Sequence, residues 1–414
     1  MIDRKVAPSK IHLFGMAFLF LLLSACAPQP TVLSPAMTPA PATSSPAPGP
    51  AANPVSAAAW GSRQIVSLDG GWQVVKVSSL DDPIPDSGWE SFQVPGILDG
   101  YDYERAWFQR NFEVSAAWQG QRLILHFGGV KFNSRILVNG QQVGAHFNGY
   151  DAFDLDITAA VKWGQPNLLQ VGVTDWTGVF SDSSLDLKPF AADREALRVA
   201  PADRILAPIG GLFTYYGLWD SVTLKVVPAV YVDSFFIQTS LQKNRLDLDV
   251  TLTNSGQAPF SGSLAGRIFP WAGAGRDQSG QWALQGQALA SLPAQSVSLE
   301  PGQTQTLRLT LENPALSAWS PFSPNLYILE FGFEGPGADA VRERFGWREF
   351  QTRSGDFYLN GKKVHMLAAS WWPDGKHWTR EQVVTQLQKT RAANVVAFRT
   401  HTQPWPEIWY EAAD

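Results

Sequence analysis

Short runs in which apolar and polar residues alternate fill the chain between Trp60 and Pro228, and no long amphipathic helix interrupts them. A period of two is typical of a strand with one buried face, because successive side chains point to opposite sides of a sheet. The apolar positions of three such runs are Leu123, Leu125 and Phe127, then Leu169, Val171 and Val173, then Val222, Leu224 and Val226. Residues 60–228 are therefore predicted to form a β-sandwich of jelly-roll type.

A second set of alternating runs begins at Val230. Its apolar positions include Leu246, Leu248, Val250 and Leu252, with Asp247, Asp249, Thr251 and Thr253 between them, and it continues through Leu307, Leu309 and Leu311 to Tyr327, Leu329, Phe331 and Phe333. This pattern predicts strands with one buried and one solvated face. We expect an immunoglobulin-like β-sandwich over residues 229–352, without an internal disulfide because the chain has one cysteine.

Two Asn-Gly pairs, Asn139-Gly140 and Asn360-Gly361, lie between apolar runs. Both residues of a two-residue hairpin turn need positive φ, which Asn and Gly tolerate better than other residues. Each pair therefore predicts a tight hairpin.

The predicted secondary structure changes at residues 353–414. The preceding domains are predicted to contain strands alone, whereas this segment is predicted to contain a strand, a helix and a second strand. The stretch 364–369 is largely apolar, and Thr379 with Gln382 forms a capping box that predicts the start of a helix. Asn394 is a candidate C-terminal cap of that helix. The run Val395–Phe398 is apolar throughout, as expected of a parallel strand covered on both faces.

This βαβ unit, with a second helix expected near Pro406, is typical of the first part of a parallel (β/α)8 TIM barrel. The segments Ser370-Trp371-Trp372 and Arg399-Thr400-His401 follow its two strands, and such barrels place their active sites at that end of the strands. Residues 353–414 supply roughly 60 of the ~250 residues that a barrel needs, so we expect only its first part.

The first residues resemble a bacterial lipoprotein signal. A positively charged start precedes the apolar run Ile11–Leu23, which is too short to span a bilayer, and the run ends in Leu23-Ser24-Ala25-Cys26. We expect residues 1–25 to be removed and Cys26 to be lipidated, which would place the protein on the bacterial cell envelope, periplasmic or at the cell surface. An ordinary signal peptide with an incidental cysteine is the alternative.

Residues 26–59 are rich in Pro, Ala, Ser and Thr and carry no charge, which predicts an extended tether. The formal charge of the whole chain is -5, which argues against a nucleic-acid partner. The 17 tryptophans suit stacking against sugar rings as well as filling cores.

Five short motifs occur in the order in which one enzyme family carries them. They are Ile136–Gly144 (ILVNGQQVG), Phe153–Thr158 (FDLDIT), Gly217–Leu224 (GLWDSVTL), Phe345–Arg348 (FGWR) and Phe357–Lys362 (FYLNGK). Together with the predicted order of domains, they resemble the glycoside hydrolases of family 2, which include β-galactosidases, β-glucuronidases and β-mannosidases. The resemblance implies an exo-acting, retaining glycosidase of carbohydrate catabolism. The alternative is a lipoprotein that only binds carbohydrate, for which a βαβ unit after two sandwiches would have no use.

The chain departs from the family pattern at the first barrel strand. Where the family reads G-V-N-x-H-E, this chain has Ala368–Pro373 (AASWWP), without the usual Asn and His. Retention requires two carboxyl groups about 5 Å apart. In the family both are glutamates on later strands, the acid preceded by Asn, and no Asn-Glu pair occurs in this sequence. We therefore assign no catalytic residue and expect an N-terminal fragment that is inactive by itself.

The candidate substrate-binding residues are Arg399, His401, Trp371, Trp372 and Asp374. Arg399 and His401 are two positions apart, so both should point to one side of the strand, toward the barrel interior if Phe398 packs outward. Arg399 would donate to sugar hydroxyls or to a carboxylate, or would instead hold the early strands together. The two tryptophans fit a sugar platform or a plug between domains equally, and Asp374 lies in a Pro-Asp-Gly sequence that first of all predicts a turn.

Asp151, Asp154 and Asp156 offer oxygen ligands, but their spacing matches no calcium loop. We predict no metal site and no cofactor. The expected partners are a carbohydrate substrate and, through Cys26, a membrane.

Overall fold

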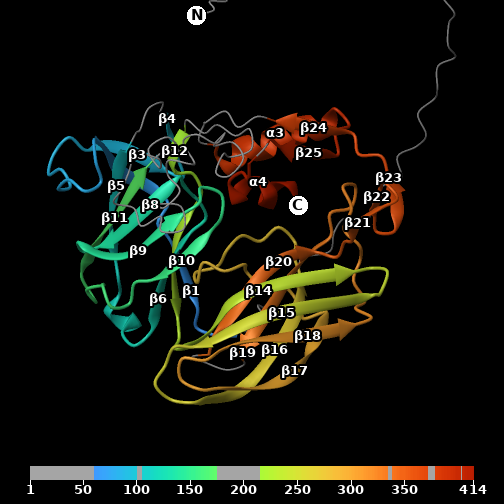
Figure 1. Cartoon of the computed structure of the whole chain (residues 1–414). Helices are drawn as coiled ribbons and strands as arrows, with labels where there is room; N and C mark the ends of the chain where they lie inside the picture. Colours follow the sequence, from blue (N-terminus) through green and yellow to red (C-terminus); the bar gives the residue numbers. More distant parts are fainter. Residues whose placement is uncertain (1–59, 100–104, 175–214, 334–337, 372–377, 402) are drawn as a thin grey trace, which may run out of the picture. The chain divides into compact units, whose positions relative to one another are not determined.

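The computed structural model describes residues 60–99, 105–174, 215–333, 338–371, 378–401 and 403–414 (Figure 1). These residues belong to one compact unit of the chain. Cys26 and the predicted tether lie outside them, as do Trp372 and Asp374. Among the described residues, none of the helices is both long and apolar enough to span a bilayer.

The first sandwich is built from antiparallel strands. One sheet has the order β1 (Gln64–Ser67), β13 (Val222–Val227), β6 (Arg122–Phe127) and β10 (Phe153–Asp156). The second has the order β3 (Glu90–Val94), β2 (Gly70–Val77), β5 (Arg105–Glu113), β11 (Pro166–Thr174), β8 (Asn133–Val138) and β9 (Gln141–Phe147). A small sheet joins β4 (Leu98–Asp99), β12 (Tyr215–Leu218) and β7 (Val130–Lys131), and the short 3-10 helix η1 (Ala116–Trp118) lies between β5 and β6.

The core of this sandwich consists of the apolar positions that the alternation singled out. Leu125 and Leu224 of one sheet and Leu169 and Val171 of the other are fully buried in the same cluster. Each such side chain contributes about 1.5–3 kcal/mol relative to an exposed one. The predicted burial of these apolar positions is confirmed, but the prediction of a solvated opposite face is wrong for β11, where Gln170 and Thr174 are buried as well.

The predicted hairpin at Asn139-Gly140 is also confirmed. The two residues have φ of 52° and 80° and join β8 to β9. The Asn139 side chain further donates to the carbonyl of Ala160 at 2.8 Å and accepts from the backbone N–H of Leu168 at 3.1 Å. This asparagine therefore both permits the turn and ties it to the neighbouring segments.

The second sandwich pairs two antiparallel sheets around another core (Figure 1). The first sheet has the order β14 (Val230–Ser240), β15 (Arg245–Asn254) and β18 (Thr304–Glu312). The second has the order β17 (Ala290–Leu299), β16 (Phe260–Pro270), β19 (Leu326–Phe333) and β20 (Ala340–Gly346). Leu246, Leu248, Val250 and Leu252 are fully buried, as predicted.

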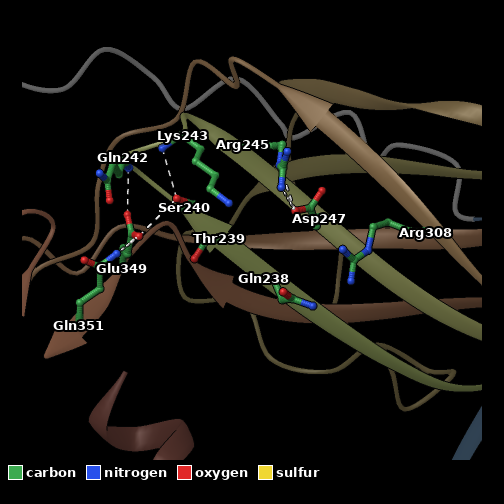
Figure 2. Close-up of a pocket in the computed structure, with 10 residues that line it drawn as sticks. All are labelled: Gln238, Thr239, Ser240, Gln242, Lys243, Arg245, Asp247, Arg308, Glu349 and Gln351. Carbon is green, nitrogen blue, oxygen red and sulfur yellow. Dashed lines mark hydrogen bonds and ion pairs between the residues drawn. The ribbon is translucent and has the colours of Figure 1, made fainter.

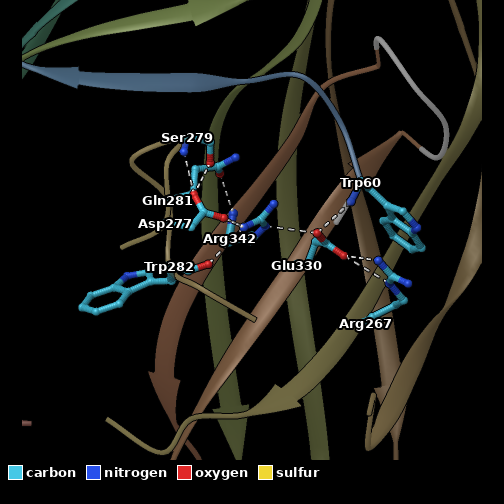
Figure 3. A network of polar contacts seen from close by, with 8 residues as sticks. All are labelled: Trp60, Arg267, Asp277, Ser279, Gln281, Trp282, Glu330 and Arg342. Atoms are coloured by element: carbon cyan, nitrogen blue, oxygen red, sulfur yellow. Dashed lines mark hydrogen bonds and ion pairs between the residues drawn. The ribbon is translucent and has the colours of Figure 1, made fainter. Parts of the chain in front are cut away.

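The prediction of one solvated face is wrong for β19, which is buried along its whole length. Its Glu330 is fully buried and forms ion pairs with Arg267 and Arg342, while its Oε1 accepts from the backbone N–H of Trp60 at 3.0 Å (Figure 3). Ile328, on the same side, packs against Trp282. The segments at residues 60 and 282 cover this face of β19. The alternation of apolar and polar residues within the strand could not predict contacts with segments so far away in the sequence.

Asp247 of β15 was likewise predicted to be solvated but is 8% exposed. Arg245 lies 2.9 Å from its carboxylate and Thr310 of the next strand donates to it at 2.7 Å. These neighbours shield the Asp247 carboxylate from solvent and supply its ion pair and its hydrogen bond.

Arg63, just before β1, links the two sandwiches. Its guanidinium donates to both carboxylate oxygens of Asp339 at 2.9 and 2.7 Å and to the carbonyl of Val232 at 2.5 Å. The Val232 N–H in turn donates to Asp339 at 2.7 Å. Because the arginine and the aspartate are both buried, this bidentate pair defines how the start of the first sandwich meets the second.

The last part of the chain begins with the small sheet β21 (Phe350–Arg353), β22 (Asp356–Leu359) and β23 (Lys362–Val364). Asn360 and Gly361, with φ of 52° and 76°, form the predicted hairpin between β22 and β23. Then follow β24 (Ala368–Trp371), α3 (Arg380–Ala392), β25 (Ala397–Thr400) and α4 (Glu407–Ala413). Among the described strands, β24 and β25 are the one parallel pair.

The predicted helix signals are confirmed. Thr379 and Gln382 form a complete capping box at the start of α3, and Asn394 follows its end with φ of 61°. The strand after it starts two residues later than Val395, because the Val395 N–H still bonds to the carbonyl of Thr390 at 3.2 Å. One βαβ unit is therefore present, and its place in a TIM barrel stays a prediction.

Candidate functional site

The candidate site lies where β24 and β25 end. The two strands pair in parallel, with Ser370 opposite Arg399 and Trp371 opposite Thr400. The backbone N–H of His401 donates to the carbonyl of Trp371 at 2.9 Å, which extends the contact past the end of the strands. Because parallel strands end at the same edge of a sheet, the side chains that follow both strands meet there.

Arg399 and His401 point to the same side of β25, as predicted. The Nη1 atom of Arg399 lies 3.4 Å from Nδ1 of His401, and Oγ of Ser370 lies 3.4 Å from the same nitrogen. These long contacts bring together three polar groups from two strands. A guanidinium can only donate, so in this contact Nδ1 of His401 can act only as the acceptor. Arg399 is exposed, which leaves guanidinium donors available to a ligand, and His401 is half-buried.

The opposite side of this strand pair packs on an aromatic cluster. Trp405 and Trp409 are 6% and 2% exposed, and their rings lie 4.7 Å apart. The Trp371 ring contacts both, at 6.4 and 5.8 Å between centroids, and Phe398 joins the same cluster. Phe398 therefore packs away from Arg399, as the strand alternation requires, and the half-buried Trp371 is held by the cluster. A role of Trp371 as a sugar platform stays a prediction.

Helix α4 supports this cluster and is held by a residue of the first sandwich that the sequence did not single out as functional. The carboxylate of Asp220, just before β13, accepts hydrogen bonds from the Glu407 N–H at 3.3 and 3.2 Å and from the Ser221 N–H at 2.8 Å. Pro406, the N-cap residue of α4, supplies no side-chain cap. The Asp220 carboxylate therefore caps the start of α4 from a distant part of the sequence. Burial raises the pKa of Asp220 to about 7.

The second sandwich and α3 hold the other end of α4. Arg276 and Arg380 each lie 2.8 Å from the carboxylate of Glu411, and Arg344 donates to the Glu411 carbonyl at 2.6 Å. Nearby, burial and then the charge of Glu407 raise the pKa of Glu343 to about 7. The helix is thus positioned by charged groups from three parts of the chain.

The three aspartates considered as metal ligands each face a different cation or imidazole. Asp154 lies 2.8 Å from Lys225 and 2.5 Å from His126, Asp156 pairs with Arg122, and Asp151 lies 2.9 Å from His146. Across the described ranges, no three acidic, His or Cys side chains are grouped as a metal site would require.

The sequence matches two family models whose ranges adjoin. Residues 93–228 match the sugar binding domain of glycosyl hydrolases family 2, and residues 230–348 match a second model of the same family. Together these ranges cover more than half of the chain. The chain belongs to glycoside hydrolase family 2.

Curated relatives agree with this family 2 assignment. A putative beta-glucuronidase of Formosa agariphila is 25% identical over 325 residues, which are 75% of this chain and 34% of that protein. A beta-galactosidase of Priestia megaterium is 22% identical over 395 residues, 83% of this chain and 34% of the relative. The chain thus spans about a third of the length of these curated relatives.

A solved structure shows the same fold. The beta-glucuronidase of Bacteroides uniformis superposes with a TM-score of 0.67 at 20% identity, over 85% of this chain and 41% of that one. Within this family 2 chain, Ser370, Arg399 and His401 lie after both matched ranges. Asp220 lies inside the first, in the Gly217–Leu224 motif, and this motif was the signal in the sequence that could have drawn attention to it.

Proposed function

We propose that this family 2 chain belongs to an exo-acting, retaining β-glycosidase whose sugar site includes the ends of β24 and β25. The observation that carries this proposal is the meeting of Ser370, Arg399 and His401 at one edge of a parallel strand pair, on an exposed side. A binding protein composed of sandwiches alone would have no use for this unit.

The proposed roles follow from the chemistry of the side chains. Arg399 would donate paired hydrogen bonds to sugar hydroxyls or to a catalytic carboxylate, and the His401 imidazole would line the same site. Trp371, Trp372 and Asp374 are proposed to complete the sugar site. The two carboxyl groups that retention requires are proposed to lie outside this sequence, which spans about a third of its relatives' length.

We also propose that Cys26 anchors the protein to the bacterial cell envelope through a lipid. The support is the apolar run Ile11–Leu23 followed by Leu23-Ser24-Ala25-Cys26.

The test of the enzymatic proposal is hydrolysis of 4-nitrophenyl β-D-glucuronide, β-D-galactoside and β-D-mannoside. It should use the product of the complete gene, including any codons after that of Asp414, with the 414-residue chain beside it. We expect the former to hydrolyse at least one of the three and the latter none. Failure of the complete product on all three substrates would contradict the proposal.

A further inference from the structure

A polar groove of about 380 Å³ lies on the outer face of the second sandwich (Figure 2). Its volume is within the range of ~300–1,000 Å³ typical of small-molecule sites. Its lining residues are all polar or charged: Gln238, Thr239, Ser240, Gln242, Lys243, Arg245, Asp247, Arg308, Glu349 and Gln351. A groove of this composition suits a ligand that forms hydrogen bonds rather than an apolar one.

Strand register builds the floor of the groove. Gln238 lies opposite Asp247, which in turn lies opposite Thr310, so one polar row crosses β14, β15 and β18. The next row in the direction of the turn places Ser240 opposite Arg245. Side chains of one row share a face because their strands are in register, so the outer face presents a grid of polar groups.

Glu349 and Gln351 form a wall beside this floor. The Glu349 carboxylate accepts from the backbone N–H of Gln242 at 2.8 Å and from the Ser240 hydroxyl at 3.3 Å, and the Gln351 amide also donates to it. The Glu349 carboxylate therefore attaches the wall to the β14–β15 turn. Its hydrogen bonds are made to groups of the protein itself.

The other carboxylates at the groove are also engaged. Arg245 pairs with Asp247 at 2.9 Å, and Arg308 holds Asp249 through contacts of 2.5 and 2.6 Å. Lys243 differs: its side chain runs from the turn along the groove, and its ammonium forms no ion pair with the described residues (Figure 2). The charges of Lys243, Arg245 and Arg308 balance those of Asp247, Asp249 and Glu349, so the charged donor left for a ligand is the Lys243 ammonium.

We propose that this groove is an accessory binding site for an acidic saccharide unit, a sugar ring that carries a carboxylate. The carboxylate would face the Lys243 ammonium, and the ring hydroxyls would meet the Gln242 amide and the second N–H of the Gln238 amide, whose first N–H donates to Asp249 at 3.2 Å. This site is separate from the ends of β24 and β25 and does not depend on the proposed activity.

The experiment is calorimetric titration of the 414-residue chain with methyl β-D-glucuronide, methyl β-D-glucoside and inorganic sulfate. We expect the glucuronide to bind at least tenfold more tightly than either other probe. Lys243→Met should weaken that binding about tenfold or more, because it removes the charge and keeps most of the length of the side chain. Lys243 is exposed, so the variant should fold normally.

Lys162→Met, an exposed lysine of the first sandwich, is the matched control and should leave binding unchanged. Arg399→Lys should also leave it unchanged, which separates this groove from the site at β25. Sulfate binding as tight as that of the glucuronide would overturn the saccharide assignment. Equal affinities of wild type and Lys243→Met, or a loss caused by Arg399→Lys alone, would overturn the groove as the site.

Discussion

The two carboxylate oxygens of Asp220 accept hydrogen bonds from the backbone N–H of Glu407, 187 residues further along the chain, at 3.3 and 3.2 Å. The first sandwich thereby caps the helix that carries Trp409, and Trp409 packs under the two strands that carry Arg399 and His401. This series of contacts connects the first sandwich to the position of the candidate site.

We expect Asp220→Asn to remove part of the pH dependence of stability. Burial raises the pKa of Asp220 to about 7, so the folded state binds its proton more tightly than the unfolded state, where the pKa is about 4. Its stabilising contribution is complete below about pH 4 and is lost as the pH rises to about 7. The variant should match wild type near pH 4 and be more stable at pH 8, as measured by urea unfolding. Asp86→Asn, at an exposed position, should show no such difference.

Glu330→Gln should destabilise the second sandwich strongly. The substitution removes the carboxylate charge that pairs with the guanidinium groups of Arg267 and Arg342. Removing one partner of a buried ion pair lowers the free energy of unfolding by about 3–5 kcal/mol. The free energy of unfolding from urea titration measures the effect. Glu300→Gln, on an exposed loop, is the control and should lie within about 0.5 kcal/mol of wild type. A similarly small change in Glu330→Gln would contradict the importance of this network.

Arg399→Lys should reduce kcat/KM for the preferred glycoside by about 10²-fold or more in the product of the complete gene. Lysine keeps the charge but loses the planar fork, and this loss corresponds to roughly 2.7 kcal/mol of transition-state stabilisation. Tm should be measured on the same samples, with Arg391→Lys, an exposed position of α3, as the control. Unchanged turnover with a lowered Tm would assign Arg399 to the scaffold instead.

Trp409→Ala should loosen the unit formed by β24, α3 and β25. Truncating a buried tryptophan costs about 3–5 kcal/mol, and this ring contacts Trp371, Trp378, Phe398 and Trp405. Amide hydrogen exchange should therefore accelerate over residues 380–400 while the sandwiches keep their protection. Phe322→Ala, at a ring that is 81% exposed, should have little effect. Uniform acceleration across the chain would mean that this unit has no separate stability.

Cys26→Ser should release the protein from the membrane fraction of the bacteria that produce it. The Leu23-Ser24-Ala25-Cys26 sequence is the basis of the expectation, and Cys26 is the single cysteine of the chain. Mass spectrometry of the wild-type N-terminus should find a lipid on this residue. An unmodified N-terminus after Cys26 would contradict the proposed anchor.

The sequence by itself determined the local elements. The period of two at Leu246–Leu252, the Asn-Gly turns and the Thr379 capping box all depend on interactions within a few residues, so each could be predicted without the rest of the chain. For the same reason, the common side of Arg399 and His401 followed from strand geometry.

Only the tertiary structure decided what covers each face. Glu330 was placed on a solvated side, yet Arg267, Arg342 and Trp60 enclose it, and Asp220 caps a helix almost two hundred residues away. The packing of Trp371 beside Trp405 and Trp409 was likewise visible only in the tertiary structure, and its role as a sugar platform stays a prediction. These outcomes depend on contacts between segments far apart in sequence, and the free energy of burial is set by those contacts rather than by local pattern.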